Sequence, residues 1–227
     1  MKSDHFWKTK SLFKKAIQQI LSVENNLLFD EAALPAYAHK NPLIDYLFWE
    51  RLAVVDNFIQ HRYPYPIRIL DFGCGTGVMS YMLSNKHLIC ANDLKFSPLR
   101  AVWKKIQFPD NVQFVEGDIR MLDNLSKVEV VVALDVLEHM SEADITSYFH
   151  YFMDLLQPNG ILLISGPTEN RLYQIGRKLA GKRFTGSYHT NDIDKIIKQL
   201  NTFARVEVIA DLVWPISLFK IIKIEKS

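Results

Sequence analysis

The feature that most constrains the fold of this chain is an apolar run that ends in an acid and a glycine-rich turn. The segment 67–72 is short, largely apolar and bounded by turn residues, as expected of a buried strand. An apolar segment that begins at Val78 predicts a helix, and the turn between them is Gly73-Cys74-Gly75-Thr76-Gly77. Strand, glycine turn and helix form the first unit of a doubly wound α/β domain, whose ligand lies beyond the carboxyl ends of the strands.

The glycine spacing helps to distinguish two kinds of nucleotide cofactor. A dinucleotide fingerprint has the pattern Gly-x-Gly-x-x-Gly, and here Val78 stands at the third glycine position. Asp71, two residues before the first glycine, would repel a pyrophosphate but not a cofactor that carries a sulfonium and an ammonium group. An NAD-type oxidoreductase is therefore the weaker alternative. The remaining alternative is that the glycine-rich turn has a structural role and binds no ligand.

Five stretches in order resemble the class I S-adenosylmethionine-dependent methyltransferases, and they are 70–77, 92–93, 117–118, 134–139 and 156–164. The stretch 134–139 (Leu-Asp-Val-Leu-Glu-His) is similar to the small-molecule group typified by ubiquinone and menaquinone biosynthesis, the "type 11" methyltransferases. The resemblance implies an α/β fold with a doubly wound, seven-stranded, mostly parallel sheet, the Rossmann-like methyltransferase fold, with N-terminal helices. It also implies S-adenosyl-L-methionine as the cofactor and S-adenosyl-L-homocysteine as its product.

The division of the chain is predicted from the same pattern. We expect an N-terminal helical cap over 1–62 and a methyltransferase domain over 63–227, with a substrate-cap insertion at about 167–190. The formal charge of +2 gives no argument for a nucleic-acid partner. Two cysteines make no disulfide framework, and no apolar run reaches the roughly 20 residues that span a bilayer. A cytoplasmic location is therefore expected.

Two helices are predicted before the first strand. Residues 3–24 have an apolar stripe with lysines largely off it, so this helix either packs on its own domain or makes peripheral contact with an anionic membrane. A second helix is expected to begin at Asn41-Pro42, where Asn can cap and Pro fits the first turn, and to run to about His61.

The cofactor residues are predicted from the strand ends. Asp93, 16 residues past Gly77 and at the end of a strand that begins at Leu88, suits a ribose diol, and Leu94 would flank the adenine. The resemblance implies that Asp118 accepts a hydrogen bond from the adenine amino group and that Ile119 packs on the adenine ring. A residue of the N-terminal helices reaches the methionine end, for which Arg51 and Tyr37 are candidates. The predicted cofactor-binding residues are Asp71, Gly73, Cys74, Gly75, Gly77, Asp93, Leu94, Asp118, Ile119, Asp135 and Arg51.

The chemistry is expected after the fourth strand, 128–134, a nearly continuous apolar run. This strand delivers Asp135, Glu138 and His139 to the carboxyl edge of the sheet. His139 is the first candidate for a general base, because imidazole titrates near neutrality, and His189 is the second. Either histidine could instead be structural.

The segment 167–190 is basic and aromatic, which would suit an anionic or amphiphilic acceptor; a solvated amphipathic helix is the alternative. The predicted acceptor-binding residues are Glu138, Arg171, Tyr173 and Tyr188. The expected activity is methyl transfer to an O, N or C atom of a small molecule, including lipid-linked and glycan acceptors. A catalytically silent cofactor-binding protein stays open, and no cluster with metal-ligand spacing is present in the sequence.

The remaining boundaries are predicted from turn and cap residues. A helix after Ser97-Pro98 is expected to run to about Gln107, and a fifth strand, 161–165, to follow a turn at 158–160. A helix capped by Asp192 should run to Leu200. Two β segments, 203–209 and 216–224, close the chain, and the resemblance implies that they form an antiparallel pair.

Overall fold

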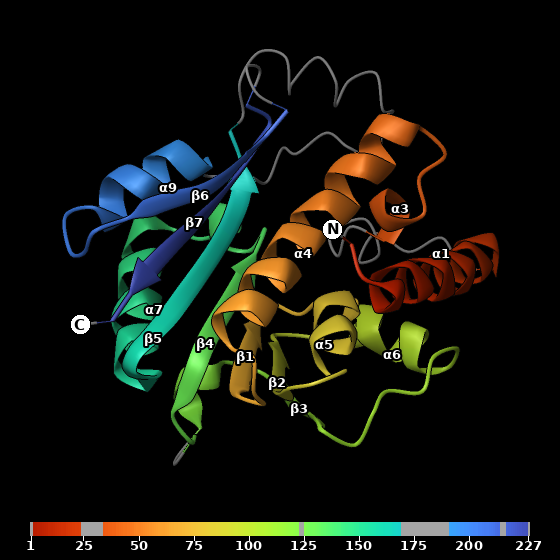
Figure 1. The fold of residues 1–227 in the computed structure, drawn as a ribbon, viewed down its shortest axis with the longest axis horizontal. Helices are drawn as coiled ribbons and strands as arrows, with labels where there is room; N and C mark the ends of the chain where they lie inside the picture. The colour runs from red at the N-terminus through yellow and green to blue at the C-terminus, as the bar shows by residue number, and fades with distance from the viewer. Residues whose placement is uncertain (1, 24–33, 123–124, 169–190, 214–216, 227) are drawn as a thin grey trace. The chain divides into compact units, whose positions relative to one another are not determined.

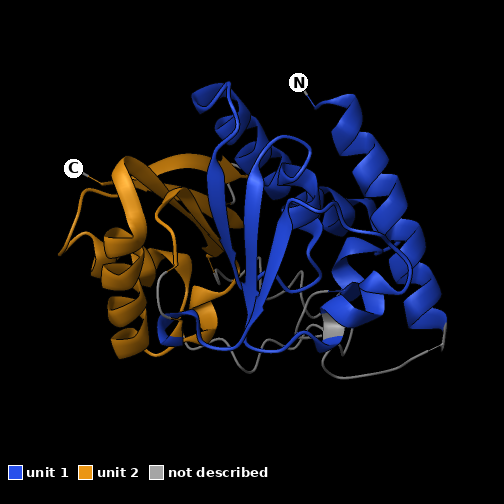
Figure 2. Cartoon of the chain, turned by 90° about the horizontal axis from the view of Figure 1, so that it is seen from below, with its two compact units in different colours: residues 1–121 blue, residues 122–227 orange. Residues whose placement is uncertain are grey.

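The computed structural model describes residues 2–23, 34–122, 125–168, 191–213 and 217–226 of the chain. These residues form two compact units, Met1–Met121 and Leu122–Ser227 (Figure 2). Among the described residues, helices precede the first strand and strands then alternate with helices as far as residue 200. The strands β1 (Arg68–Phe72), β2 (Leu88–Asp93), β3 (Val112–Glu116), β4 (Val128–Leu134), β5 (Leu156–Pro167), β6 (Glu207–Leu212) and β7 (Phe219–Glu225) lie in the order β3-β2-β1-β4-β5-β7-β6 in a seven-stranded sheet (Figure 1). The predicted α/β fold with a seven-stranded, mostly parallel sheet is confirmed.

The first unit begins with the helices α1 (Asp4–Val23), α3 (Leu34–Tyr37) and α4 (Pro42–Arg62). The apolar stripe of α1, which includes Phe6, Phe13 and Ile17, is buried, and the helix contacts α3, α5 and α6. The predicted start of α4 is confirmed, because the Asn41 side chain accepts a hydrogen bond of 2.9 Å from the Leu43 amide. Burial of the stripe means that α1 uses its apolar face within its own unit.

The first unit contributes three parallel strands to the sheet, and these are β1 (Arg68–Phe72), β2 (Leu88–Asp93) and β3 (Val112–Glu116). The helix α5 (Val78–Leu83) follows β1, α6 (Ser97–Trp103) follows β2, and the short 3₁₀ helix η1 (Ile119–Met121) follows β3. Helix α6 ends four residues before the predicted Gln107. The Lys105 amide bonds the carbonyl of Val102, three residues back, so the last turn tightens before Pro109.

The second unit contains β4 (Val128–Leu134), η2 (Leu137–His139), α7 (Glu142–Leu155), β5 (Leu156–Pro167), α9 (Ile193–Leu200), β6 (Glu207–Leu212) and β7 (Phe219–Glu225). Strand β5 runs parallel to β4 and antiparallel to β7, and β6 pairs antiparallel with β7. The predicted antiparallel end of the sheet is thus confirmed. Helices α7 and α9 each begin with a side-chain cap. The Ser141 side chain accepts a hydrogen bond from the Asp144 amide, and the Asp192 side chain accepts one from the Lys195 amide.

Three predicted boundaries in this unit were wrong. Strand β5 begins at Leu156 and not at 161; the predicted turn is an irregularity inside it, where Asn159 has a φ of 59° and the register with β4 shifts. Strand β6 begins at Glu207 and not at 203, because the Phe203 amide still bonds the Leu200 carbonyl at the end of α9. Strand β7 begins at Phe219 instead of 216.

Candidate functional site

The glycine turn is a tight bend in which all three glycines have left-handed backbone angles. The φ values are 71° at Gly73, 53° at Gly75 and 74° at Gly77. At Gly77 a side chain is excluded as well, since an added Cβ would lie 2.8 Å from Leu99 Cδ1 and 2.8 Å from Phe108 Cζ. The turn closes with a 2.8 Å hydrogen bond from the Gly77 amide to the Cys74 carbonyl. Glycine is therefore needed here for backbone geometry and for space.

Asp71 lies at the end of β1, and its side chain is buried instead of lining the turn. Its Oδ2 accepts a hydrogen bond of 2.5 Å from the Ser80 hydroxyl in α5. Burial raises the pKa of Asp71 to about 6, while the Ser80 hydrogen bond opposes that rise. The carboxylate thus links β1 to α5. In its ionised form it is a buried negative charge two residues before the glycine turn.

Cys74 is buried in the turn. Burial raises the pKa of its thiol well above the usual value, and the nearby Asp71 and Asp93 add to the rise. A thiol kept protonated in this way is a poor nucleophile, so Cys74 serves as a small residue of the turn.

Asp93, at the end of β2, is bonded to the glycine turn. Its Oδ2 accepts from the Gly75 amide at 2.8 Å, and the neighbouring Asn92 carbonyl accepts from the Cys74 amide at 2.9 Å. Burial raises the pKa of Asp93, and hydrogen bonds from backbone amides, that of Gly75 first, oppose the rise. The turn and the predicted ribose acceptor are therefore brought together at one strand edge.

The predicted adenine residues follow β2 and β3. Leu94 is 62% exposed, which leaves its side chain available to a ligand, whereas Ile119 is fully buried. Asp118 is engaged by Arg120, whose Nη2 lies 2.6 Å from Asp118 Oδ2 and whose Nε lies 3.0 Å from Oδ1. The predicted acceptor for the adenine amino group thus has a cation beside it.

The two candidates from the N-terminal helices, Arg51 and Tyr37, lie together. Arg51 is 2% exposed, and its Nη2 donates to the Tyr37 hydroxyl at 3.2 Å. The guanidinium centre also lies 4.2 Å from the centroid of the Phe48 ring, within cation–π range. A buried guanidinium held between aromatic rings is a fixed positive charge.

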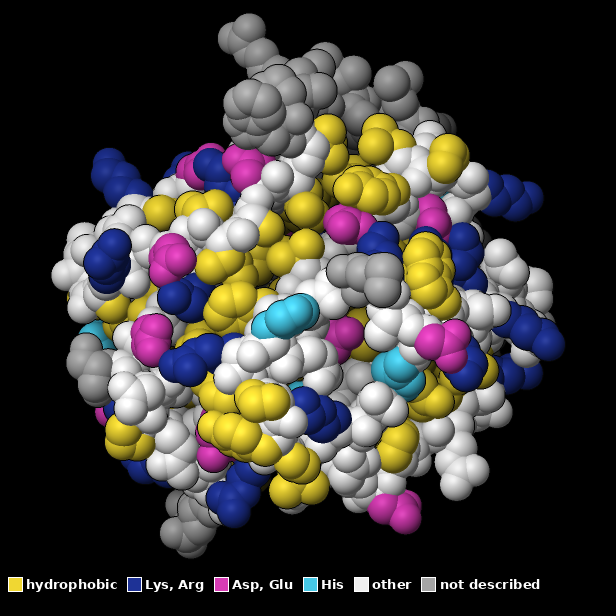
Figure 3. Space-filling model, in the orientation of Figure 1, with side chains coloured by type: hydrophobic (Ala, Val, Ile, Leu, Met, Phe, Trp, Pro, Cys, Tyr) yellow, Lys and Arg dark blue, Asp and Glu magenta, His cyan; other side chains and the backbone are white. Residues whose placement is uncertain are grey.

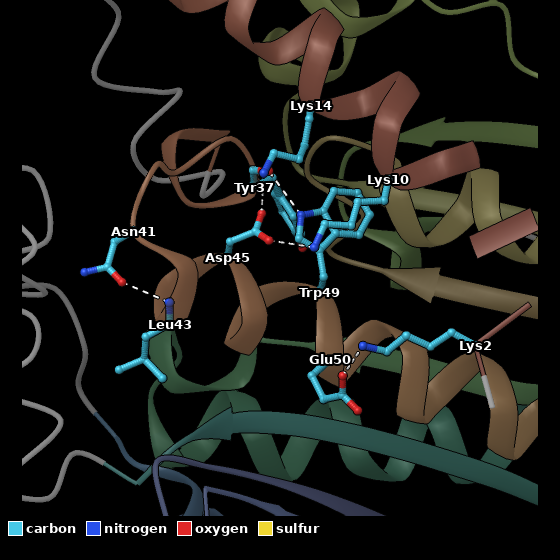
Figure 4. Close-up of polar contacts among 9 residues, drawn as sticks. All are labelled: Lys2, Lys10, Lys14, Tyr37, Asn41, Leu43, Asp45, Trp49 and Glu50. Carbon is cyan, nitrogen blue, oxygen red and sulfur yellow. Dashed lines mark hydrogen bonds and ion pairs between the residues drawn. The ribbon is translucent and has the colours of Figure 1, made fainter. Parts of the chain in front are cut away.

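Helix α1 is tied to α4 by charge as well as by apolar contact (Figure 4). Lys10 and Lys14 both bind Asp45, at 2.6 Å and 2.7 Å, and Lys2 pairs with Glu50. Burial alone would raise the pKa of Asp45, but the two lysine hydrogen bonds outweigh it and the pKa is lowered. Much of the positive charge on α1 is therefore neutralised within the unit.

The second unit presents its polar residues directly after β4. Asp135 has a φ of 54°, unusual for a residue with a side chain, and its Oδ1 accepts from the Ser165 hydroxyl at 2.8 Å. Its amide also bonds the Ser165 carbonyl at 3.1 Å. These bonds to β5 hold the backbone in a strained bend, a kind of geometry that often marks functional sites.

The two predicted acceptor-side residues in η2 differ in exposure. His139 is exposed, whereas Glu138 is 1% exposed. Asn191, just before α9, donates through its amide to the Glu138 carbonyl at 3.1 Å and through Nδ2 to the Met140 carbonyl at 2.7 Å. The histidine is thus presented outward from a braced turn. The other predicted residues, His189, Arg171, Tyr173 and Tyr188, lie outside the described residues.

Sequence reasoning missed three residues that organise these sites: Ser80, Arg120 and Asn191. The signal for Ser80 was its place in the first turn of the helix after the glycines, facing back toward the strand. Arg120 follows Asp118 by two residues, a spacing at which a long side chain can reach back to a carboxylate. Among the described residues no group of His, Cys, Asp and Glu could hold a metal ion, and no helix is long and apolar enough to cross a membrane.

Comparison with known proteins shows what this chain is similar to. Residues 69–160 match the model of the family described as "Methyltransferase domain". The chain is 30% identical over 117 residues to a malonyl-[acyl-carrier protein] O-methyltransferase of Halalkalibacterium halodurans, covering 48% of this chain and 42% of that protein. It is 24% identical over 136 residues to a ubiquinone biosynthesis O-methyltransferase of Rickettsia prowazekii, covering 58% of this chain and 53% of that protein. The matches thus span about half the length of these curated relatives.

The fold is also shared with solved structures. The N-methyltransferase NodS from Bradyrhizobium japonicum WM9, crystallised with S-adenosyl-L-homocysteine, superposes with a TM-score of 0.63 at 12% identity, covering 95% of this chain and 98% of that one. At that identity the likeness shows the fold alone. The family match over residues 69–160, which include the glycine turn and the strands that follow it, makes this part of the chain similar to a methyltransferase domain.

Proposed function

We propose that this protein is an S-adenosylmethionine-dependent methyltransferase with a small-molecule acceptor. The observation that carries the proposal is the hydrogen-bonded junction of the glycine turn with Asp93 at the carboxyl edge of β1 and β2. Such an edge is where doubly wound sheets bind nucleotides. The family match and the names of the relatives supply the reaction type.

The described residues offer a partner for each part of the cofactor. The glycine turn lets the backbone approach closely, Asp93 accepts from the ribose hydroxyls, and the exposed Leu94 flanks the adenine beside Asp118. Arg51, held by Tyr37, is the partner for the methionine carboxylate. The buried charge of Asp71 favours a cation near the turn.

The reaction needs a nucleophile, a methyl carbon and a sulfur in line. Since the leaving sulfide is neutral, alignment accounts for much of the rate acceleration. When bound, S-adenosylmethionine supplies the activated methyl group. The exposed His139 would take the proton from an oxygen or nitrogen acceptor as the new bond forms, with His189 as the second candidate.

The acceptor belongs to the small-molecule class, including lipid-linked and glycan compounds of anionic or amphiphilic character. Two relatives are named O-methyltransferases, which supports an oxygen atom as the acceptor. A nucleic-acid acceptor is not supported. On the face drawn in Figure 3, Lys and Arg side chains lie among acidic and apolar ones.

Peripheral membrane contact, in a protein that otherwise works in the cytoplasm, is confined to a small part of α1. The apolar stripe of this helix is buried, and Lys8, Lys10 and Lys14 are paired with acids of the same unit. The outward Trp7 and Lys15 are the residues that we assign to contact with a lipid surface. Sedimentation with vesicles of anionic lipid tests this contact. No difference between wild type and a Trp7→Ala, Lys15→Ala double variant would remove it.

Calorimetric titration tests the proposed function. We expect S-adenosylmethionine and S-adenosylhomocysteine to bind and NADH not to bind, and a screen of quinone, lipid and sugar acceptors to give methylated product. Binding of NADH alone would indicate the oxidoreductase. Cofactor binding with no product from any acceptor class would favour the catalytically silent protein.

A further inference from the structure

An aromatic cluster in the first unit connects helix α1 with the glycine turn. Phe108 lies in the segment between α6 and β3, and its ring is half-buried. The ring centroid lies 6.3 Å from that of Phe13 in α1 and 5.5 Å from that of Tyr81 in α5, both in edge-to-face geometry. Phe13 and Tyr81 also meet edge to face, at 5.4 Å. The three rings therefore pack as one cluster, in an arrangement that aromatic pairs favour.

The Phe108 ring also lies against Gly77, the last residue of the glycine turn and the N-cap of α5. A Cβ added at Gly77 would lie 2.8 Å from Phe108 Cζ and 3.0 Å from Cε1, closer than two carbon atoms pack. The space that a side chain would need at Gly77 is thus filled by the ring edge. Phe13, which is fully buried, therefore reaches the turn through a single intervening ring.

A second buried phenylalanine of α1 provides the contrast. Phe6 is 1% exposed, but its ring packs edge to face on Trp7 and Trp49, at 5.2 Å and 6.1 Å. Trp7 belongs to α1 itself and Trp49 to α4. Phe6 thus holds α1 to α4, whereas Phe13 holds it to the rings beside the turn.

We propose that Phe108 is a positioning residue for the glycine turn, and that it couples the docking of α1 to cofactor binding. A closely packed interior transmits displacement, so a ring that loses its neighbour Phe13 shifts against the turn. With Phe13 in place, the ring keeps the turn in the bend that the cofactor contacts. The effect on the cofactor rests on the proposed function, but the effect on the turn needs no ligand.

Hydrogen exchange of the protein without ligand tests the effect on the turn. The amide of Gly77 donates to the Cys74 carbonyl, so its exchange reports how often the turn opens. We expect Phe13→Ala and Phe108→Ala each to speed this exchange about tenfold. Phe6→Ala, the control matched in residue type and burial, should leave it within about twofold of wild type.

Calorimetric titration with S-adenosylhomocysteine tests the coupling to the cofactor. Phe13→Ala should raise the dissociation constant about tenfold, and Phe6→Ala should leave it near the wild-type value. In a Phe108→Ala background, Phe13→Ala should have no further effect on exchange or affinity, because the two side chains act through one ring. Leucine variants at the same three positions repeat the comparison if an alanine variant does not fold.

Three results would overturn the inference: unchanged exchange in Phe108→Ala, equal effects of Phe6→Ala and Phe13→Ala, or additive effects of the Phe13 and Phe108 variants. Faster exchange in Phe13→Ala with an unchanged dissociation constant would reject the coupling to the cofactor. The proposed function fails differently. If wild type does not bind S-adenosylhomocysteine but Phe13→Ala still speeds exchange at the turn, the cofactor assignment is wrong and the positioning role of Phe108 stands.

Discussion

The amide of Gly75 donates to the carboxylate of Asp93 at 2.8 Å, so the centre of the glycine turn and the acid that ends β2 are bonded directly. The acid therefore has two tasks, because it holds the turn in place and faces the site proposed for the ribose. A substitution there should disturb both the position of the turn and the contact with the cofactor.

We expect Asp93→Ala to weaken binding of S-adenosylhomocysteine by roughly 1–3 kcal/mol, the usual loss for hydrogen bonds to a charged group. Isothermal titration measures the effect, and Asp110→Ala, which removes an exposed acid of the same unit, is the control. Equal dissociation constants for Asp93→Ala and the control would remove Asp93 from the ribose role.

We expect Gly77→Ala to lower the free energy of unfolding by about 1–3 kcal/mol more than Gly117→Ala does, because overpacking adds to backbone strain only at the first site. Both glycines have positive φ, 74° and 111°, but an added Cβ meets Leu99 and Phe108 at Gly77 and nothing within 4 Å at Gly117. Urea denaturation of the two variants gives the comparison. Equal losses would mean that strain alone explains the requirement for glycine.

The buried Asp71 predicts a pH-dependent difference between wild type and Asp71→Asn. The folded pKa is about 6 and the unfolded value about 3.9, so folding takes up protons between those values and wild type loses stability as pH rises through this window. Asparagine has no such loss. The stability of Asp71→Asn relative to wild type should therefore increase by about 2–3 kcal/mol from pH 4 to pH 7.

Denaturant titrations at several pH values measure this difference. Asp110→Asn, at an exposed acid, is the control and should show no comparable trend. A constant difference between Asp71→Asn and wild type across the window would mean that the Asp71 carboxyl has an ordinary pKa in the folded protein.

We expect His139→Ala to reduce kcat by about 10²–10⁴-fold for an oxygen or nitrogen acceptor, the usual contribution of a general base, while cofactor affinity stays near wild type. The exposed His150 of α7 offers a matched control as His150→Ala. Wild-type turnover in this variant would leave His189 as the remaining candidate.

The sequence allowed the order of strands and helices and the glycine turn to be predicted, since these depend on local apolar patterns and on residues with special backbone needs. The end of α6 and the start of β6 could not be predicted, because they depend on individual hydrogen bonds of Lys105 and Phe203. Asp71, Asp93 and Asp118 were found as polar residues at strand ends. Their hydrogen bonds to Ser80, Gly75 and Arg120 were not predicted, because pairing depends on the packed geometry.

The double attachment of Lys10 and Lys14 to Asp45 has a practical consequence for how the protein is handled. A chain shortened to begin after Val23 would uncover the apolar surface now sealed by Phe6, Phe13 and Ile17, and would leave one half-buried carboxylate without either countercharge. Helix α1 thus covers apolar surface of the first unit. We expect a chain that lacks it to aggregate.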